Sequence, residues 1–141
     1  MARVPVPQFE LEVERLDDRG HGLGTGPRGK TVRVRAAPPG ARLLVAVLGR
    51  SKKGLDARRV ATIRPPADAV PPRCAVFGVC GGCTLQELPL ERQRELKVAE
   101  AVRVVGGAPV VHPLRGVPEG FGHRNKVELS FGVRRFVSSS T

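Results

Sequence analysis

Three cysteines lie within ten residues, in the stretch Cys74-Ala-Val-Phe-Gly-Val-Cys80-Gly-Gly-Cys83, and the 141-residue sequence has no others. Thiolates are the soft, negatively charged ligands that hold most iron–sulfur clusters. A compact cluster needs several thiolates close together, so the chain must curl around it. Gly81 and Gly82 lack a Cβ and can let the backbone pass near such a core. The spacing therefore predicts three ligands of an iron–sulfur cluster whose fourth ligand lies outside this sequence.

Other chemistry remains open for these cysteines. Structural zinc takes four ligands, usually from two C-x2-C pairs or from added histidines. Here there is one such pair, and His21, His112 and His123 are scattered along the chain. A disulfide would leave one cysteine over, and a reducing compartment disfavours it. Zinc binding and structural or redox thiols are therefore the alternatives.

The sequence contains no secretion signal and no apolar run of membrane-spanning length. We therefore expect a cytoplasmic protein without a membrane partner. The formal net charge is +11, and residues 19–55 contain nine basic residues and no carboxylate. A field of one sign over that length attracts polyanions such as the phosphate backbone of nucleic acids. A solvated surface in an arginine-rich chain is the simpler alternative.

The candidate nucleic-acid contacts in this half of the chain are basic residues on turns and on outward strand positions. They are Arg28, Lys30, Arg33, Arg35, Lys52, Lys53, Arg58 and Arg59.

The elements that carry these cations are predicted to be short strands. Residues 8–16 alternate apolar and charged side chains, which is typical of a half-buried strand. Residues 30–35 alternate in the same way, residues 41–48 form an apolar run, and residues 55–63 suggest a final strand. Between the first two, residues 17–27 contain four glycines and are predicted to be a loop. This pattern predicts a mostly β fold, a small five-stranded barrel of the OB type.

Barrels of this type bind single strands through a charged groove, usually with aromatic side chains on which bases stack. Such side chains are missing here apart from Phe9. We therefore expect mainly contacts to the nucleic-acid backbone and little sequence readout.

After the barrel, two proline pairs bracket a stiff linker, residues 65–72. A helix is predicted from Gln86 to Val105, with Pro89 in its first turn and two glycines after its end. Leu96, Ala99, Val102 and Val105 recur at three-residue steps and are predicted to face a core.

The last part of the sequence contains Arg124, Asn125 and Lys126 at the start of a predicted strand, Val127 to Phe131. These three side chains could hold a phosphate or a base edge. Because a lone strand pair is not stable by itself, we expect the sequence to be part of a longer protein.

The order of these features resembles a known family. A β-barrel, then Pro71-Pro72-Arg73-Cys74-x5-Cys80-Gly-Gly-Cys83-x2-Gln86, then a helix and Arg124-Asn125-Lys126, is similar to the bacterial uracil-5 RNA methyltransferases with an N-terminal TRAM domain. Those acting on large-subunit ribosomal RNA are the most similar. Two glycine- and proline-containing stretches, residues 20–24 and 37–41, resemble the signatures of the TRAM barrel. The resemblance extends to about Arg135, with His123 where the family usually has Tyr.

The resemblance implies that Cys74, Cys80 and Cys83 are ligands of a [4Fe–4S] cluster, with the fourth cysteine further along. It implies that the barrel binds ribosomal RNA and not DNA. It also implies that Arg124, Asn125 and Lys126 lie at the start of an α/β central domain. The resulting division is 1–66 for the barrel, 67–86 for the linker and cysteine loop, and 87–141 for the helix and the start of the central domain.

The family's catalytic cysteine and its domain for S-adenosylmethionine have no counterpart in these residues. We therefore expect this chain alone to be inactive in methyl transfer, with the catalytic portion as a partner. A free-standing TRAM-type RNA-binding module and a zinc-binding structural or interaction protein are the alternatives.

Overall fold

The computed structural model describes residues 6–52, 54–106, 112–116 and 120–122. Several sites expected from the sequence lie outside the described residues: Lys53, Arg124, Asn125 and Lys126, and the predicted strand from Val127 to Phe131.

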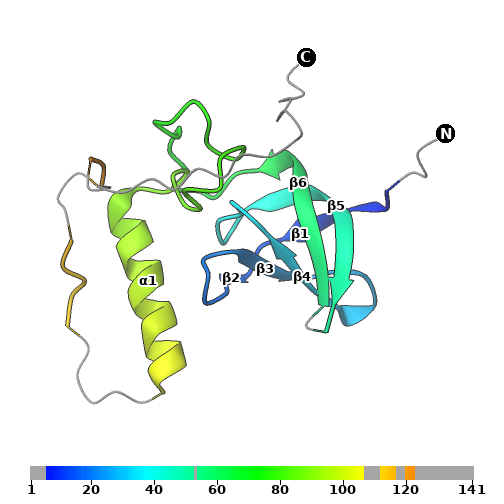
Figure 1. Ribbon diagram of the computed structural model, residues 1–141, viewed down its shortest axis with the longest axis horizontal. Helices are drawn as coiled ribbons and strands as arrows, with labels where there is room; N and C mark the ends of the chain where they lie inside the picture. Colours follow the sequence, from blue (N-terminus) through cyan, green and yellow to red (C-terminus); the bar gives the residue numbers. More distant parts are fainter. Residues whose placement is uncertain (1–5, 53, 107–111, 117–119, 123–141) are drawn as a thin grey trace, which may run out of the picture.

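The described chain is dominated by one six-stranded sheet followed by one helix (Figure 1). The strands are β1 (Gln8–Glu12), β2 (Arg15–Leu16), β3 (Gly22–Thr25), β4 (Thr31–Val34), β5 (Arg42–Ser51) and β6 (Gly54–Arg64). Their order across the sheet is β1-β5-β6-β4-β3-β2. Neighbours pair antiparallel except β4 and β6, which are parallel.

The two edges of this sheet are joined by the chain itself. Strands β1 and β2 lie at opposite edges, yet only Val13 and Glu14 separate them. The N–H of Val13 donates to the carbonyl of Ala41 at 2.9 Å, and that of Glu14 donates to the carbonyl of Leu23 at 2.8 Å. The sheet therefore curls back on itself. With β1 and β2 counted as one bent strand, it is a small five-stranded barrel, as the sequence predicted.

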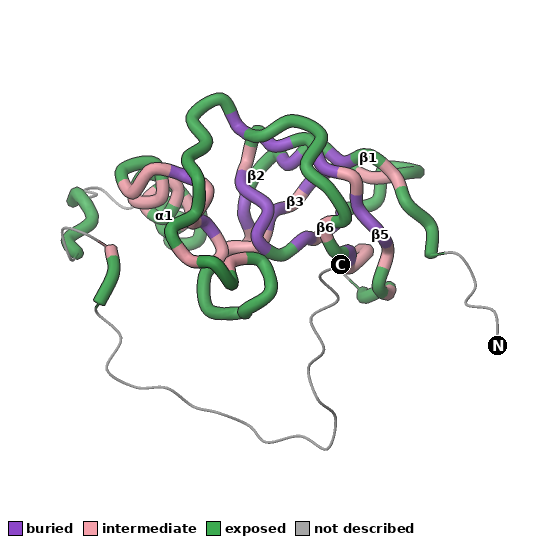
Figure 2. Tube along the Cα trace, turned by 90° about the horizontal axis from the view of Figure 1, so that it is seen from above, coloured by how far each residue is buried: buried purple, intermediate pink, exposed green. Residues whose placement is uncertain are grey.

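Alternating residues form an aliphatic core inside this curl. Figure 2 shows the buried positions along the strands of the sheet. The buried members of this core are Leu11, Val13, Val32, Val34, Ala37, Ala41, Leu43, Val45 and Ala57. On β1 and β4 the intervening charged residues face outward, which confirms the period of two read from the sequence. Burying one Val or Leu side chain contributes about 1.5–3 kcal/mol, so this layer is the main source of stability.

Strand β3 lies within the stretch that we predicted to be a loop, residues 17–27, and that prediction was wrong for Gly22–Thr25. The glycines here allow close packing of two strands. A Cβ on Gly24 would lie 2.1 Å from the carbonyl oxygen of Glu12, and one on Gly22 would lie 2.3 Å from that of Ala37. The glycines therefore serve the closure of the barrel.

The helix α1 spans Leu90–Val105, so the predicted start at Gln86 was four residues early. Pro89 stands at the N-cap position, and its carbonyl accepts the N–H of Gln93 at 3.0 Å. The residues before it form a turn, in which the N–H of Leu88 donates to the carbonyl of Leu85 at 3.0 Å.

The apolar stripe predicted along the helix faces a core only at Leu96. That side chain packs against a small cluster of Leu16, Leu85 and Leu88. Further along, Val102 is 37% exposed and Val105 is 68% exposed, so the prediction was wrong for the second half of α1. The apolar contacts of the helix stripe thus lie in its N-terminal half.

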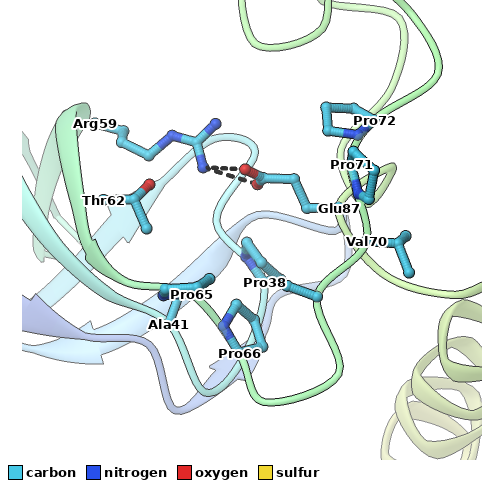
Figure 3. A pocket seen from close by; sticks show the side chains of 11 residues that line it. Pro38, Ala41, Arg59, Thr62, Pro65, Pro66, Val70, Pro71, Pro72 and Glu87 are labelled. Carbon is cyan, nitrogen blue, oxygen red and sulfur yellow. Dashed lines mark hydrogen bonds and ion pairs between the residues drawn. The ribbon is translucent and has the colours of Figure 1, made fainter.

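Within the described residues, one ion pair connects the barrel to the segment before α1 (Figure 3), in addition to the packing of Leu16, on β2, against Leu85 and Leu88. Nη1 of Arg59, on β6, donates to both carboxylate oxygens of Glu87, at 2.9 and 2.7 Å. Both side chains are only about a fifth exposed, at 21% and 22%. The carbonyl of Glu87 also accepts the N–H of Val70 at 2.9 Å. Glu87 therefore holds both the barrel and the proline-rich linker.

We expect Gly24→Ala to lower the free energy of unfolding by about 1–3 kcal/mol, because the added methyl group collides with the backbone of Glu12. Gly49, on β5, is the matched control. It has no atom within 4 Å of its Cβ position, so Gly49→Ala should be neutral or slightly stabilising. Urea denaturation of both variants is the measurement. Equal stabilities would contradict the close approach of β3 to Glu12.

We also expect Arg59 and Glu87 to be energetically coupled. A double-mutant cycle with Arg59→Gln and Glu87→Gln should give an interaction energy of about 1–2 kcal/mol, since the pair is largely shielded from water. The control pair is Arg64 with Glu12, at 3.2 Å and more than 60% exposed, for which about 0–0.5 kcal/mol is expected. An interaction energy no larger than that of the control pair would show that the Arg59–Glu87 ion pair does not stabilise the contact between the barrel and the segment before α1.

Candidate nucleic-acid interface and cysteine loop

Five of the predicted nucleic-acid contacts are exposed on the barrel and have no ion-pair partner within the described part of the chain. They are Arg28, Lys30, Arg35, Lys52 and Arg58. Arg28 lies in a short 3-10 turn, Pro27–Gly29, with a left-handed backbone (φ 60°). Arg58 is on β6, and Lys52 lies in the turn between β5 and β6. These side chains are accessible to a phosphate backbone.

Two other predicted contacts are engaged inside the protein. Arg33 donates through Nε to Asp56 at 2.8 Å, with Nη2 of the same guanidinium at 2.7 Å. The two residues face each other on the parallel strands β4 and β6. Arg59 is held by Glu87, as described above. The charge of these two arginines is therefore partly neutralised, which sequence spacing could not reveal.

The cysteine loop, defined here as residues 74–83, is folded by its own backbone. The N–H of Phe77 donates to the carbonyl of Cys74 at 3.1 Å, and that of Cys80 donates to the carbonyl of Val76 at 2.9 Å. At its start, the N–H of Cys74 donates to Oε1 of Gln86 at 3.2 Å. Gln86 thus anchors the beginning of the loop to the turn that follows its end.

The cysteine loop lies against two arginines of the barrel, between β6 and the top of α1 in Figure 1. A Cβ on Gly81 would lie 2.7 Å from Nη2 of Arg35, and one on Gly78 would lie 3.7 Å from Nη2 of Arg59. A side chain at Gly81 would require the end of the Arg35 side chain to move. The guanidinium of Arg35, which has no ion-pair partner in the described chain, therefore places positive charge beside the loop that carries the thiols, whereas the charge of Arg59 is paired with Glu87.

All three cysteines are free thiols, with Cys74 half-buried and Cys80 and Cys83 exposed. Thiolates are suitable donors for an iron–sulfur cluster. Across residues 6–52, 54–106, 112–116 and 120–122, however, no three His, Cys, Asp or Glu side chains are gathered as a metal site. The donor chemistry fits the predicted cluster, but the three thiols do not converge in the described chain.

Among the hollows that the described residues form, three lie around the loop and barrel. The smallest, about 240 Å³, is the proline-lined hollow in Figure 3 that contains Arg59 and Glu87. A second, of about 480 Å³, lies between the barrel and the end of α1 and contains Asp17, Asp18 and Asp56. We call it the carboxylate groove.

The largest hollow, about 650 Å³, lies between the cysteine loop and α1. Arg73, Cys80, Cys83, Lys97 and Phe121 are among its lining residues, and we call it the cysteine groove. Among the described residues that line it there is no carboxylate.

Asp17 is ionised in the carboxylate groove. Burial by itself raises the pKa of this carboxyl, but hydrogen bonds from His21 and from the N–H of Arg19 outweigh it and hold the pKa below its ordinary value. The N–H of His21 donates at 2.8 Å and its Nδ1 lies 3.1 Å from the second oxygen. Arg15, Arg33 and Arg103 also line this groove, so the formal charges of its arginines and aspartates balance.

Further along α1, the guanidinium of Arg103 donates to Glu100 at 2.5 Å and lowers the pKa of that carboxyl, while the same bond raises the pKa of Arg103. Both groups are therefore charged at neutral pH.

Sequence reasoning missed Phe121. Its ring is 41% exposed, and the guanidinium carbon of Arg73 lies 4.8 Å from the ring centroid. An exposed aromatic ring with a guanidinium over its face is a cation–π pair. The one available signal was an isolated aromatic residue between two glycines, Gly120 and Gly122.

No protein-family model matches the chain. Curated relatives do. The chain is 36% identical over 134 residues to the 23S rRNA (uracil(1939)-C(5))-methyltransferase RlmD of Alkalilimnicola ehrlichii, covering 91% of this chain and 29% of the relative. It is 45% identical over 87 residues to the RlmD of Chromohalobacter salexigens, covering 62% of this chain and 18% of the relative. An archaeal relative, the tRNA (uracil(54)-C(5))-methyltransferase of Pyrococcus abyssi, is 36% identical, with 84% and 27% covered.

The chain thus spans less than a third of the length of these relatives, and it matches their N-terminal part. No helix within the described ranges is long and apolar enough to cross a membrane. The resemblance read from the cysteine spacing is confirmed: the chain is homologous to the N-terminal part of the RNA uracil-C5 methyltransferases.

Proposed function

We propose that this chain is the RNA-contacting N-terminal part of an enzyme that methylates C5 of uracil in RNA, with ribosomal RNA as the substrate class. The match over 91% of the chain to a 23S rRNA methyltransferase carries the proposal. The exposed cations on the barrel support it independently, since RNA is a polyanion.

The physical basis of this RNA contact is electrostatic. Arg28, Lys30, Arg35, Lys52 and Arg58 are exposed and unpaired within the described chain, so they can neutralise phosphates and release counterions. Such contacts orient a strand but do not read its bases. The barrel would therefore supply affinity, and sequence selection would lie elsewhere in the enzyme.

We infer the same three segments, with the same roles, that the sequence suggested. Residues 1–66 form the RNA-binding barrel, residues 67–86 the linker and cysteine loop, and residues 87–141 the helix and the start of a central domain. The domain that binds S-adenosylmethionine and the thiol that attacks uracil would be supplied by a catalytic portion outside these residues. Such an enzyme would act in the cytoplasm.

Cys74, Cys80 and Cys83 are proposed as three ligands of a [4Fe–4S] cluster. Their thiolate chemistry supports this, as does the unpaired guanidinium of Arg35 beside the loop, which would offset part of the negative charge of a thiolate-bound cluster. Metal binding is coupled to local folding, so convergence of the thiols would accompany loading. When bound, the cluster would crosslink the loop to the element that provides the fourth ligand.

RNA affinity should fall steeply with salt. For single-stranded RNA, the slope of log K against log salt should shrink by about 0.7 for each phosphate contact that Lys30→Gln or Arg58→Gln removes. Arg42→Gln is the matched control, because it removes the same charge from a surface arginine already paired with Glu10 at 2.6 Å. Filter binding over a salt series is the measurement. An unchanged slope in all three variants would contradict the barrel interface.

Anaerobic reconstitution with iron and sulfide should give a brown protein with less than one cluster per chain, because one ligand is missing. Cys80→Ser should abolish iron retention, whereas the control Val79→Ser, on a neighbouring side chain that is 76% exposed, should not. Iron and sulfide analysis after desalting is the measurement. A colourless protein that retains zinc in its place would overturn the cluster assignment in favour of a zinc site.

A further inference from the structure

We propose that one end of the barrel binds the phosphate backbone of duplex RNA. This end, which we call the cationic end, carries Arg28, Lys30, Arg50 and Lys52 on or beside two turns. The inference rests on the proposed function and deepens it, since it names the form of RNA that the barrel contacts and the part of the barrel that makes the contact.

The fold places the two turns side by side, at the lower end of the barrel in Figure 1. One turn joins β3 to β4 and carries Arg28 and Lys30, and the other joins β5 to β6 and carries Lys52. A Cβ on Gly54, at the start of β6, would lie 2.1 Å from the carbonyl oxygen of Thr31, at the start of β4. Cations from two separate stretches of the sequence therefore share one surface.

Strand register brings the fourth cation to the same end. Leu55 of β6 is paired with Arg50 of β5 and with Val32 of β4. Because neighbouring strands lie about 4.8 Å apart, the backbones at Arg50 and Val32 are separated by about 10 Å. Lys30 precedes Val32 by two residues, so a polyanion that touches one turn is within reach of the cations of the other.

The charge of the cationic end is not cancelled by its surroundings. Its four side chains are exposed and have no ion-pair partner within the described chain. Asp56, on the adjoining part of β6, is already bound by Arg33 at 2.8 Å. The carboxylate groove, which Thr31 and Gly54 also line, has balanced formal charges. A phosphate backbone at this end would therefore meet net attraction.

The surface of the cationic end is poorly suited to a single strand. Proteins that bind single strands combine a charged groove with aromatic rings on which bases stack. The four cations line none of the three hollows described above. Phe9 lies near this end, but its ring is half-buried against the core and against Gly26. Neither a groove nor an open stacking surface is therefore offered by these residues.

A duplex needs neither of these features. Double-stranded RNA is recognised largely by its shape and by contacts to its phosphates and 2′-hydroxyls. Its two strands also present more phosphate charge per unit length than one strand does, which strengthens attraction to a compact group of cations. An exposed cationic end without stacking rings thus favours a base-paired segment of RNA.

The cationic end is separate from the cysteine loop. Lys30 precedes β4 and Arg35 follows it, and the side chain that lies against Gly81 is that of Arg35. The four residues of β4 that separate Lys30 from Arg35 span about 13 Å. A duplex at the cationic end and a cluster held by the cysteine loop can therefore be bound together.

The double variant Lys30→Gln/Lys52→Gln removes one cation from each turn. In the full 141-residue chain, which should bind a duplex RNA more tightly than a single strand of equal length, it should weaken duplex binding about tenfold at low salt. The slope of log K against log salt should shrink by about 0.9 for each lost contact. Filter binding of both RNAs over a salt series is the measurement.

The matched control is Arg42→Gln/Arg64→Gln. These two arginines face each other in register at the opposite end of the β5–β6 pair, and they are bound by Glu10 and Glu12. The control removes the same charge from the chain but no unpaired cation from the barrel surface. It should leave the slope for the duplex unchanged.

Arg28 offers a variant that separates binding from stability. Its backbone is left-handed (φ 60°), a conformation that is costly for arginine and readily adopted by glycine. Arg28→Gly should therefore keep or raise the midpoint of urea denaturation, while it weakens duplex binding about threefold by removing a phosphate contact.

The possible failures are distinguishable. If RNA binds but the single strand binds more tightly than the duplex, or if the Lys30/Lys52 double variant behaves like its control, the duplex site is refuted and the barrel interface stands. Unchanged duplex binding by Arg28→Gly would exclude the turn between β3 and β4 from the site and refute the two-turn arrangement. If neither RNA binds at low salt, the proposed function fails and the duplex site fails with it.

Discussion

The ion pair between Arg59 and Glu87 is the contact on which the arrangement of this chain depends. On one side stands β6, near the middle of the curled sheet, and on the other the turn that precedes α1. The same arginine lies beside Gly78 of the cysteine loop, and the same glutamate holds the linker through Val70. These two partly shielded charges, together with the packing of Leu16 against Leu85 and Leu88, keep the barrel, the linker and the cysteine loop in one spatial relation.

The barrel can provide a charged surface because its own closure uses almost no polar side chains. Its interior is aliphatic, and the approach of β3 to the bend after β1 is made possible by glycine. The arginine and lysine side chains of the barrel therefore lie on its outer surface. Some of them are then used internally: Arg33 pairs with Asp56 and Arg59 with Glu87, while Arg35 lies against the cysteine loop. Arg58, which is exposed, and Arg59, which lies beside the cysteine loop, are neighbours on β6.

The helix α1 is the element least supported by the described chain. Leu96 packs on a small cluster, but Val104 and Val105 are more than 60% exposed. Its charged side chains form i,i+3 pairs along the surface, such as Arg103 with Glu100, and these contribute little stability. This contrast explains why periodicity was informative for the strands and misleading for the second half of the helix. The apolar side chains of the strands pack against one another inside the barrel. Apolar spacing on α1 shows only that the helix has a face that could pack, not that the described chain covers it.

The sequence by itself determined the aliphatic alternation of β1 and β4, the five-stranded barrel, the proline-bracketed linker and the cysteine spacing, because each is a local pattern with a short period. It could not determine that residues 22–25 form a strand, since glycines in a loop and glycines in a close strand contact look alike. Nor could it tell which arginines are paired, or that Phe121 lies under Arg73, because those partners are distant in the chain. Only the tertiary structure decides which charges remain available, since an ion pair depends on distance in space.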